Sequence, residues 1–382
     1  MIWYALKMLS FQLDNESTKL LIALNEAVLE KNTLLAAMST KDKEAIHHYA
    51  WISTVGASTR IENAILTDSE VDWLDSVLEK DAKKTAFEAH KKIIADKFSK
   101  DKERSLEEVA GCRTVLLLIY EQAKSYTPFT ETIMRGLHAE LLRHYSKPGI
   151  VKGGYKNHPN SVVEENHSTG HKKTIFKTAA PGLETELAMK ELVAWYNDAI
   201  RKEPWTIAVA CEFVFRFLAI HPFQDGNGRL GRALFLMSLL QSPQEKLANV
   251  VYCLAIDRHI ERHKEEYYIV LNQCSDGKFE VDSNKYKIEI FLRYMLKVLQ
   301  ESLKDIDFYI KRVEAFKKLS ESTLKVFECF KEFPEIRLKP KAIQENTGLP
   351  TRTVSNALTA LLADEFIQRN GRGSATYYQL IF

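Results

Sequence analysis

The sequence predicts a mainly α-helical protein with one β-hairpin in its middle and a small mixed unit at its C-terminal end. Apolar residues recur at a spacing of about 3.6 over long windows such as 18–31 and 187–200, which is typical of amphipathic helices. The segment 151–178 breaks this pattern with paired glycines and alternating polar and apolar residues, which favours a hairpin. We expect three regions: an N-terminal helical region (1–100), a central core (101–315) and a C-terminal domain (316–382).

The bulk composition is that of an ordinary globular protein. Of 382 residues, 45% are apolar and 27% are charged, and the formal net charge of +2 argues against a protein that coats nucleic acid over its whole surface. The five cysteines are widely spaced and form no CxxC pair, which fits reduced thiols and gives no zinc signature. No apolar run reaches transmembrane length, so we expect a cytoplasmic protein without a membrane partner.

The most informative segment is the run of twelve residues from His221 to Arg232, His-Pro-Phe-Gln-Asp-Gly-Asn-Gly-Arg-Leu-Gly-Arg. A glycine-rich turn before an apolar helical run exposes backbone N–H groups, and the helix dipole favours an anion there. Arg229 and Arg232 are three residues apart, so both guanidinium groups can lie on one helix face. Asp225 suits a divalent cation, and His221 stands where a base could take a proton. A simple capping turn would need only one Asp or Asn and one Gly.

This run resembles the signature of the Fic family, His-Pro-Phe-x-Asp/Glu-Gly-Asn-Gly/Lys-Arg-x-x-Arg, at every defined position. The resemblance implies a nucleotidyltransferase that moves AMP from ATP to a Ser, Thr or Tyr hydroxyl of a protein. It implies that His221 is the catalytic base, that Asp225 holds Mg²⁺, and that Arg229 and Arg232 hold the β- and γ-phosphates. The other positions that it implies in ATP binding are Gly226, Asn227, Gly228, Leu230 and Gly231. Glycine at position 228, in place of lysine, keeps AMP transfer as the implied reaction.

A second motif lies upstream, in the periodic stretch that ends at Asn63. Ser58, Glu62 and Asn63 fit a pattern similar to the family's inhibitory motif, in which Ser or Thr is followed four residues later by Glu and then Gly or Asn. The resemblance implies that Glu62 pairs with Arg232 in place of the γ-phosphate and restrains the enzyme. Alone this pattern is weak, because three loosely defined positions recur by chance. The alternative is a Ser and a Glu on adjacent turns of an exposed helix.

Two further assignments depend on the same resemblance. The hairpin at 151–178 is implied to be a flap that holds a target protein by strand addition, whereas without the resemblance it is a surface hairpin. Leu254, Tyr267 and Tyr268 lie where the family builds its adenine pocket, although apolar and aromatic residues of this kind are more often plain core. Relatives in the family also suggest a homodimer.

The C-terminal domain resembles a winged helix-turn-helix. Outward-facing polar residues on its third helix are expected to meet a DNA major groove, and two arginines near the wing are expected to meet phosphates. We predict helices at 323–333, 340–347 and 351–362, with Thr351 as the cap of the third, and two strands around a wing at 370–374. The expected DNA-facing residues are Arg352, Thr353, Ser355, Asn356, Arg369 and Arg372. The alternative is a winged helix that contacts proteins, since this face is only mildly basic.

Three functions remain open at this point. The first is AMP transfer restrained by Glu62. The second is removal of AMP from a modified protein at the same site, with Glu62 positioning water, because both directions share every signature residue. The third is a regulatory DNA-binding protein whose Fic core senses nucleotide. The sequence does not decide the target protein, the direction of transfer, the partner of the winged helix or the oligomeric state.

Overall fold

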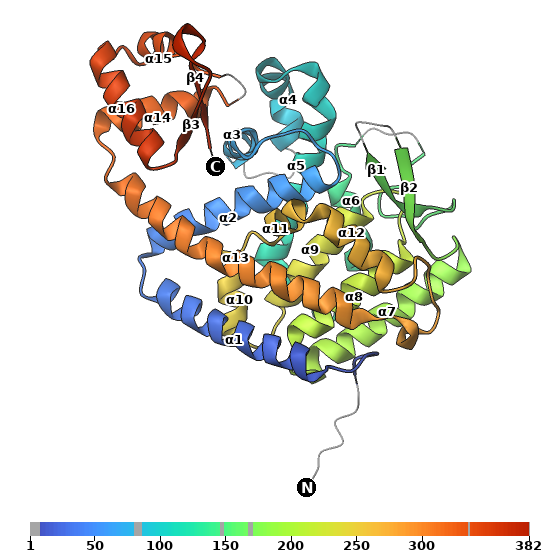
Figure 1. Cartoon of the computed structure of the whole chain (residues 1–382). Coiled ribbons are helices and arrows are strands. Elements are labelled where there is room, and N and C mark those ends of the chain that lie inside the picture. The colour runs from blue at the N-terminus through green and yellow to red at the C-terminus, as the bar shows by residue number, and fades with distance from the viewer. Residues whose placement is uncertain (1–7, 80–85, 146–148, 167–170, 335–336, 382) are drawn as a thin grey trace.

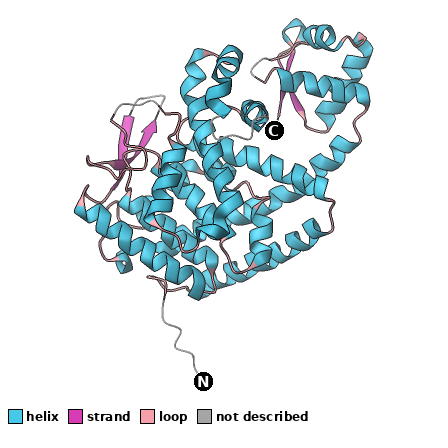
Figure 2. Ribbon diagram, turned by 180° about the vertical axis from the view of Figure 1, so that it is seen from behind, coloured by secondary structure: helices cyan, strands magenta, loops and turns pink. Residues whose placement is uncertain are grey.

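The computed structural model describes residues 8–79, 86–145, 149–166, 171–334 and 337–381. In this part of the chain the fold is mainly helical, with two small β-hairpins on opposite sides of the molecule (Figure 1, Figure 2). The elements of the large helical body are α1 (Asn15–Ala36), α2 (Thr40–Ile61), α3 (Asp68–Glu79), α4 (Ala86–Lys97), α5 (Glu103–Gln122), α6 (Glu131–Leu141), β1 (Ser161–Asn166), β2 (His171–Lys177), α7 (Leu183–Lys202), α8 (Thr206–Ile220), α9 (Asn227–Leu240), α10 (Glu245–Val251), α11 (Ile256–Arg262), α12 (Lys264–Gln273) and α13 (Ile288–Lys317). Those of the C-terminal unit are α14 (Glu321–Glu332), α15 (Pro340–Thr347), α16 (Thr351–Ala363), β3 (Ile367–Asn370) and β4 (Tyr377–Leu380).

The buried apolar side chains form two separate groups. The first extends from Leu9 to Val313, and the second, inside the C-terminal unit, extends from Val326 to Leu380. The expected N-terminal region and central core therefore share one hydrophobic core. The long helix α13 crosses this body and leads into the C-terminal unit, which stands at its far end (Figure 1).

The first hairpin lies where the sequence predicts one, within 151–178. Strands β1 and β2 pair antiparallel, with Ser161 opposite Lys177. The tip of this predicted hairpin, residues 167–170, lies outside the described residues. The end of β2 is fixed to the body, because the N–H of Lys177 donates to the carbonyl of Gly277 at 2.9 Å and the N–H of Phe279 donates to the carbonyl of Lys177 at 2.8 Å.

The C-terminal unit contains three helices followed by a two-stranded hairpin, in the predicted order. One detail of the prediction is wrong: Thr351 is the first residue of α16, and Pro350 occupies the cap position. The Thr351 hydroxyl donates to the side-chain oxygen of Gln344 at 3.2 Å.

Helix α2 occupies the centre of the helical body. It begins where the Ser39 hydroxyl accepts a hydrogen bond from the N–H of Asp42 at 3.2 Å, which satisfies one of the free donors of the first turn. Every side chain from Ala50 to Thr59 is buried, and α2 packs against α5, α11 and α13. The end of α2 that carries Ser58 therefore lies inside the protein. The alternative interpretation of this motif, a Ser and a Glu on adjacent turns of an exposed helix, required an exposed position.

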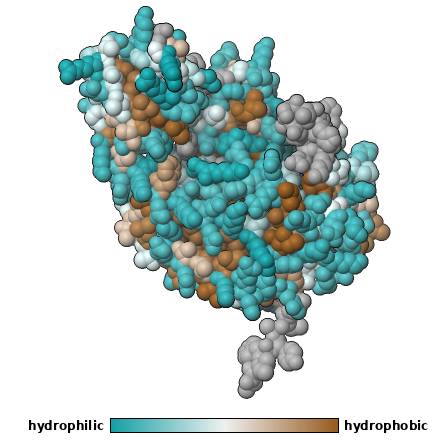
Figure 3. Space-filling model, in the orientation of Figure 1, coloured by the Kyte–Doolittle hydropathy of each residue, from teal (hydrophilic) through white to brown (hydrophobic). Residues whose placement is uncertain are grey.

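The surface is largely polar. Hydrophilic side chains cover most of the face in Figure 3, and apolar ones occur there in scattered groups. Each helix in the described ranges is too short or too polar to span a lipid bilayer. All five cysteines are free and buried.

Candidate functional site

His221 lies at the C-terminal end of α8, at the point where the chain leaves the helix. Its backbone is left-handed, with φ of 52°, and its N–H still donates to the carbonyl of Phe217 at 2.8 Å. The imidazole Nδ1 faces the carbonyl of Leu218 at 3.3 Å. Because a carbonyl oxygen only accepts, this contact assigns the proton to Nδ1 and leaves the lone pair on Nε2.

The electrostatic surroundings keep His221 neutral. Burial lowers the pKa of His221 to about 4, and the ammonium of Lys156 acts in the same direction. The carboxylates of Glu62 and Asp225 oppose this effect without outweighing it. At neutral pH the ring is therefore in the form that can accept a proton.

The loop after His221 is held in shape by Asn227, the first residue of α9. The Asn227 side chain accepts from the N–H of Phe223 at 2.9 Å and donates to the carbonyl of Phe223 at 2.7 Å. Gly226, at the cap position of α9, has φ of 80°, a conformation that costs glycine little. Since the Asn227 side chain is only 1% exposed, the structure gives it first of all the role of holding this loop closed.

His138 of α6 supports the same loop from behind. Its Nδ1 accepts from the N–H of Gly153 at 2.9 Å, so its Nε2 carries the proton and donates to the carbonyl of Asp225 at 2.9 Å. The ring stacks on Phe223 with 3.8 Å between ring centroids. Burial lowers the pKa of His138 to about 4, so it stays neutral in this position. A single histidine on a helix gave no sequence signal of this role.

Arg229 is buried on the first turn of α9 with most of its hydrogen-bonding capacity unused. It is 3% exposed, and its Nε and Nη1 have no hydrogen-bond partner among the residues that the structure describes. Its Nη2 reaches Asp225 Oδ1 at 3.5 Å. A buried guanidinium with free donors is costly, and phosphate oxygens are acceptors of matching geometry.

Arg232, one turn further along α9, is engaged by the end of α2. Its Nη1 donates to Glu62 Oε1 at 3.0 Å, its Nη2 to the carbonyl of Ser58 at 2.7 Å and its Nε to the Ser58 hydroxyl at 3.2 Å. Asp257 Oδ2 lies 3.5 Å from Nε. Burial works to lower the pKa of Arg232, but the carboxylates of Glu62 and Asp257 hold it above the usual arginine value. The structure thus brings together two predicted motifs that are 170 residues apart in the chain.

The backbone around Glu62 explains why the pattern ends in Gly or Asn. Glu62 is the cap residue at the end of α2, and Asn63 has φ of 75°. Glycine and asparagine are the residues that adopt this left-handed conformation most readily. The Asn63 side chain accepts from Lys264 Nζ at 3.1 Å. Asn63 therefore ends α2 so that the Glu62 carboxylate faces α9.

Gly228 leaves the space that the Glu62 side chain occupies. A Cβ atom at position 228 would lie 2.2 Å from Glu62 Oε1 and 3.3 Å from Arg232 Nη1. The closest approach is well inside van der Waals contact, so a side chain at position 228 would force the Glu62 carboxylate to shift from the position it has beside Arg232.

Arg60 fixes the same end of α2, a role that no sequence motif indicates. Its Nε and Nη2 donate to the two carboxylate oxygens of Glu261 at 2.7 and 3.0 Å, and its Nη1 lies 2.7 Å from Asp68 Oδ1. Such bidentate pairing is geometrically selective. Arg60 therefore ties α2 to α11 and to the start of α3.

The hairpin is joined to the His221 loop by a buried lysine. Lys156 is 3% exposed, and its Nζ donates to Asn160 Oδ1 at 2.9 Å, to the Thr178 hydroxyl at 3.0 Å and to the carbonyl of Ile220 at 2.9 Å. Asn160 in turn donates to the carbonyl of Phe223 at 2.7 Å. Burial lowers the pKa of Lys156 to about 8. Lys156 thus connects both ends of the hairpin, at Asn160 and Thr178, to Ile220, the residue before His221.

The remaining predicted site residues are mostly buried. Leu254 is 1% and Tyr267 3% exposed, and burial raises the pKa of Tyr267 to about 12, so these two side chains lie in the core. Tyr268, beside Tyr267, is half-buried. Leu230 is fully buried, and a Cβ at Gly231 would lie 3.0 Å from Leu218 of α8. Leu230 and Gly231 therefore contribute to the packing of α9 against α8.

The metal expected at Asp225 would have one protein carboxylate. Asp225 is partly exposed, its Oδ1 accepts from the N–H of Gly226 at 2.6 Å, and the Tyr145 hydroxyl donates to its Oδ2 at 3.4 Å. Across the described ranges no group of three or more His, Cys, Asp or Glu side chains converges on a metal site. This donor set fits Mg²⁺, which usually takes one or two carboxylates and completes its octahedron with phosphate oxygens and water.

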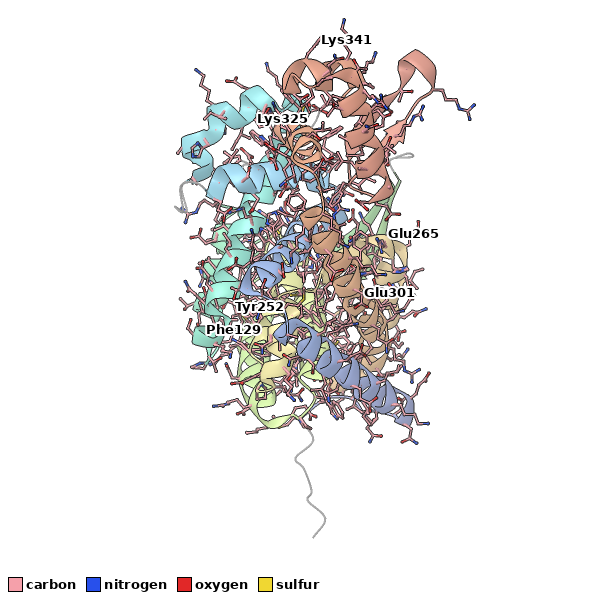
Figure 4. The ribbon with its side chains drawn as sticks, turned by 90° about the vertical axis from the view of Figure 1, so that its left-hand side faces the viewer. Phe129, Tyr252, Glu265, Glu301, Lys325 and Lys341 are labelled. Atoms are coloured by element: carbon pink, nitrogen blue, oxygen red, sulfur yellow. The ribbon has the colours of Figure 1, made fainter. Side chains whose placement is uncertain are left out.

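The predicted DNA-facing residues lie on the surface of the C-terminal unit. Arg352, Ser355 and Asn356 of α16 are exposed and Thr353 is partly exposed. Arg369 and Arg372 beside the wing are also exposed. Lys341 projects from the outer end of the unit, away from the helical body (Figure 4).

Comparison with known proteins identifies the central part of the chain. Residues 128–239 match the family model described as Fic/DOC family. This range contains the hairpin, His221, the loop and both arginines of α9, and it excludes α2 and the C-terminal unit. This part of the chain is therefore a Fic/DOC family domain, as the signature predicted.

Solved structures share the fold over a wider range. A Fic domain-containing signaling protein from Bacteroides thetaiotaomicron matches 76% of this chain and 97% of its own, with 22% identity and a TM-score of 0.56. A Fic family protein from Desulfovibrio desulfuricans matches 97% of this chain and 98% of its own, with 20% identity and a TM-score of 0.54. Fic-1 from C. elegans matches 77% of this chain and 73% of its own, with 15% identity and a TM-score of 0.53. At these identities the likeness establishes a mainly helical Fic-like fold.

Proposed function

We propose that the protein transfers AMP from ATP to a Ser, Thr or Tyr hydroxyl of a protein, itself included, and that Glu62 restrains this transfer. The observation that carries the proposal is the unequal state of two buried arginines on one turn of α9. Among the described residues, two nitrogen atoms of Arg229 have no hydrogen-bond partner, whereas Arg232 is held by Glu62 and Ser58. Phosphate oxygens would satisfy the first arginine, and would compete with Glu62 for the second.

In the proposed step the attacking hydroxyl oxygen forms a bond to the α-phosphorus of ATP. The bond between that phosphorus and the bridging oxygen breaks, and pyrophosphate leaves. The proton of the hydroxyl passes to Nε2 of His221. The Nδ1 contact with Leu218 and the pKa of about 4 support this role, since both keep Nε2 unprotonated near neutral pH.

Asp225 is the residue that would hold Mg²⁺, with phosphate oxygens and water as the other ligands. When bound, the metal would neutralise negative charge on the phosphates. Among the chain's own groups, the main-chain N–H groups at the start of α9 and the guanidinium of Arg229 face the same developing charge.

The restraint would follow from competition for Arg232. A nucleotide that reaches α9 with Glu62 in place would meet a carboxylate where its terminal phosphate needs a guanidinium. The two like charges repel, so ATP would sit in an unreactive pose or bind weakly. Release of Glu62 from Arg232 would then be the activating event.

The target segment would add as a strand to the first hairpin. Sheet β1–β2 has two strands in the described part of the chain, and β2 is fixed at its end to Gly277 and Phe279. Strand addition provides main-chain hydrogen bonds with little side-chain selectivity. The Lys156 anchor would keep that strand at a fixed height above His221.

Incubation with labelled ATP and Mg²⁺ tests the proposal, with transfer to protein as the readout. Glu62→Gly should label itself or an added protein faster than wild type. The same protein with His221→Ala should retain its fold and nucleotide binding and lose transfer by roughly 10²-fold or more. Labelling that persists at the Glu62→Gly rate without His221 would overturn the assignment. Release of AMP from a labelled protein, without net labelling, would favour the reverse reaction.

We propose as a second function that the C-terminal unit, taken as a winged helix-turn-helix, binds DNA. The supporting observation is that the polar side chains of α16 and the wing arginines are exposed on one small unit at the end of the molecule. Gel shifts at controlled salt test it, because phosphate contacts make binding weaken as salt rises. No shift with any duplex at low salt would favour a protein partner.

A further inference from the structure

A cavity of about 380 Å³ separates the C-terminal unit from the helical body. Its walls come from the first half of α2, from α3, the end of α13 and α14, and from the end of β4 with the residue that follows it. The volume lies in the range of pockets that hold small molecules. Most of its lining is apolar, contributed by residues such as Ala45, Val313, Phe316, Phe327 and Leu380. Phe316 remains 36% exposed, unusual for so large an apolar side chain.

Arg312 of α13 lines this cavity as a buried cation without an ion-pair partner in the described chain. It is 5% exposed, and its Nη1 and Nη2 donate to the main-chain carbonyls of Glu365 at 3.1 Å and Ile381 at 2.5 Å. Its Nε has no hydrogen-bond partner among these residues. The guanidinium lies against the rings of Phe366 and Tyr49, 4.7 and 5.4 Å from their centroids.

The charge around Arg312 remains poorly compensated. Burial lowers the pKa of Arg312 below the usual arginine value, although Tyr49 and Glu365 act in the opposite direction. Arginine stays charged in proteins, and a buried charge without an ion-pair partner is destabilising. An anion within reach of Nε would remove much of this cost.

The rim of the cavity favours the same kind of ligand. Lys41, Arg312, Lys317 and Lys331 stand against Asp42 and Asp72, four cations against two anions. Two of the lysines are paired with these carboxylates, since Lys317 lies 2.6 Å from Asp42 and Lys331 lies 3.8 Å from Asp72. The net excess therefore falls on Lys41 at the rim and on Arg312 within the cavity.

We propose that this cavity is a binding site for a small organic anion with an apolar body, whose acidic group pairs with Arg312. The apolar part of the ligand lies between Ala45 of α2 and the aromatic side chains of α13 and α14. The site is independent of the AMP-transfer proposal. A ligand in this cavity would contact both the C-terminal unit and α2, the helix whose cap residue is Glu62 (Figure 1). Bound ligand strengthens the packing between these two parts by mass action.

Two fluorescent probes with the same ring system test the proposal on the full-length protein. Anilinonaphthalenesulfonate is an apolar anion, and phenylnaphthylamine has the same rings without the sulfonate. The wild type should bind the anionic probe saturably at one site. Arg312→Met keeps most of the side-chain length and removes the charge, so it should weaken the binding of the anionic probe by about tenfold or more. The affinity for the neutral probe should change by less than about twofold.

Ala45→Trp provides a second test that leaves Arg312 in place. The indole should fill the cavity, so both probes should lose their saturable binding. Arg201→Met, at an exposed arginine of α7 outside the cavity, should change neither probe and serves as the matched charge control. Far-UV circular dichroism and cooperative thermal unfolding confirm that each variant is folded, since the anionic probe also binds loosened proteins.

Each outcome of these measurements either supports or overturns the proposed site. Selective loss of the anionic probe in Arg312→Met, with loss of both in Ala45→Trp, supports the site. Equal effects of Arg312→Met on the two probes overturn anion recognition by this arginine. Unchanged binding of both probes in Ala45→Trp overturns the cavity as their site.

Discussion

Replacement of Gly228 by alanine should release the restraint on the enzyme without any change to Glu62 itself. The added Cβ would lie 2.2 Å from Glu62 Oε1, so the carboxylate must withdraw by about 1 Å to reach ordinary contact. A shift of that size directed away from Arg232 would lengthen the contact with Nη1 from 3.0 Å to about 4 Å, beyond hydrogen-bond reach.

The size of the effect follows from the bond that is lost. A hydrogen bond between charged groups contributes about 1.5–3 kcal/mol, and the Glu62 side chain is 32% exposed, so solvent screening reduces this figure. We expect a loss of about 1–2 kcal/mol, which corresponds to a rise of about five- to thirtyfold in the released population.

Initial rates of self-labelling with ATP and Mg²⁺ measure this release. Gly228→Ala should approach the rate of Glu62→Gly, and the double variant should gain nothing further, because both changes remove one interaction. The double variant also shows whether the methyl group harms ATP binding, since it should match Glu62→Gly alone. If the double variant is active while Gly228→Ala is as slow as wild type, the proposed steric conflict is wrong.

Other predictions concern the base, the metal and the C-terminal unit. Because the pKa of His221 is lowered to about 4, the ring keeps its base form as the pH falls. The kcat/KM of the Glu62→Gly protein should therefore change less than about twofold from pH 7.5 to 5.5. A loss of kcat/KM centred near pH 6.5, the ordinary pKa of histidine, would contradict the environment assigned to His221. Asp225→Ala should abolish Mg²⁺-dependent transfer, and activity that survives EDTA would exclude a metal role. Arg352→Ala should weaken DNA binding, which gel shifts at a fixed low salt concentration would detect.

Local features of the site could be predicted from the sequence. Gly226 before an apolar run indicates a turn that leads into a helix, and Arg229 and Arg232 fall on one face because a helix has a fixed period. The hairpin within 151–178 and the order of elements in the C-terminal unit also follow from local patterns. In each case the determining interactions lie within a few residues of one another.

Long-range support could not be predicted in this way. His138 and Lys156 hold the His221 loop through hydrogen bonds to main-chain atoms, which leave no trace in residue type. That Leu254 and Tyr267 line an adenine pocket stays a prediction, and both side chains are buried, as apolar and aromatic residues of a helical body usually are. The contact between Glu62 and Arg232 could be predicted only because each of the two residues belongs to a recognisable motif.

Intact-mass measurement after incubation with ATP and Mg²⁺ tests the central claim most directly. We predict that wild type remains largely unmodified, that Glu62→Gly gains the mass of one or more AMP groups, and that Arg232→Ala in the Glu62→Gly background gains less. Equal masses for wild type and Glu62→Gly at every ATP concentration, with ATP binding intact in both proteins, would contradict AMP transfer restrained by Glu62.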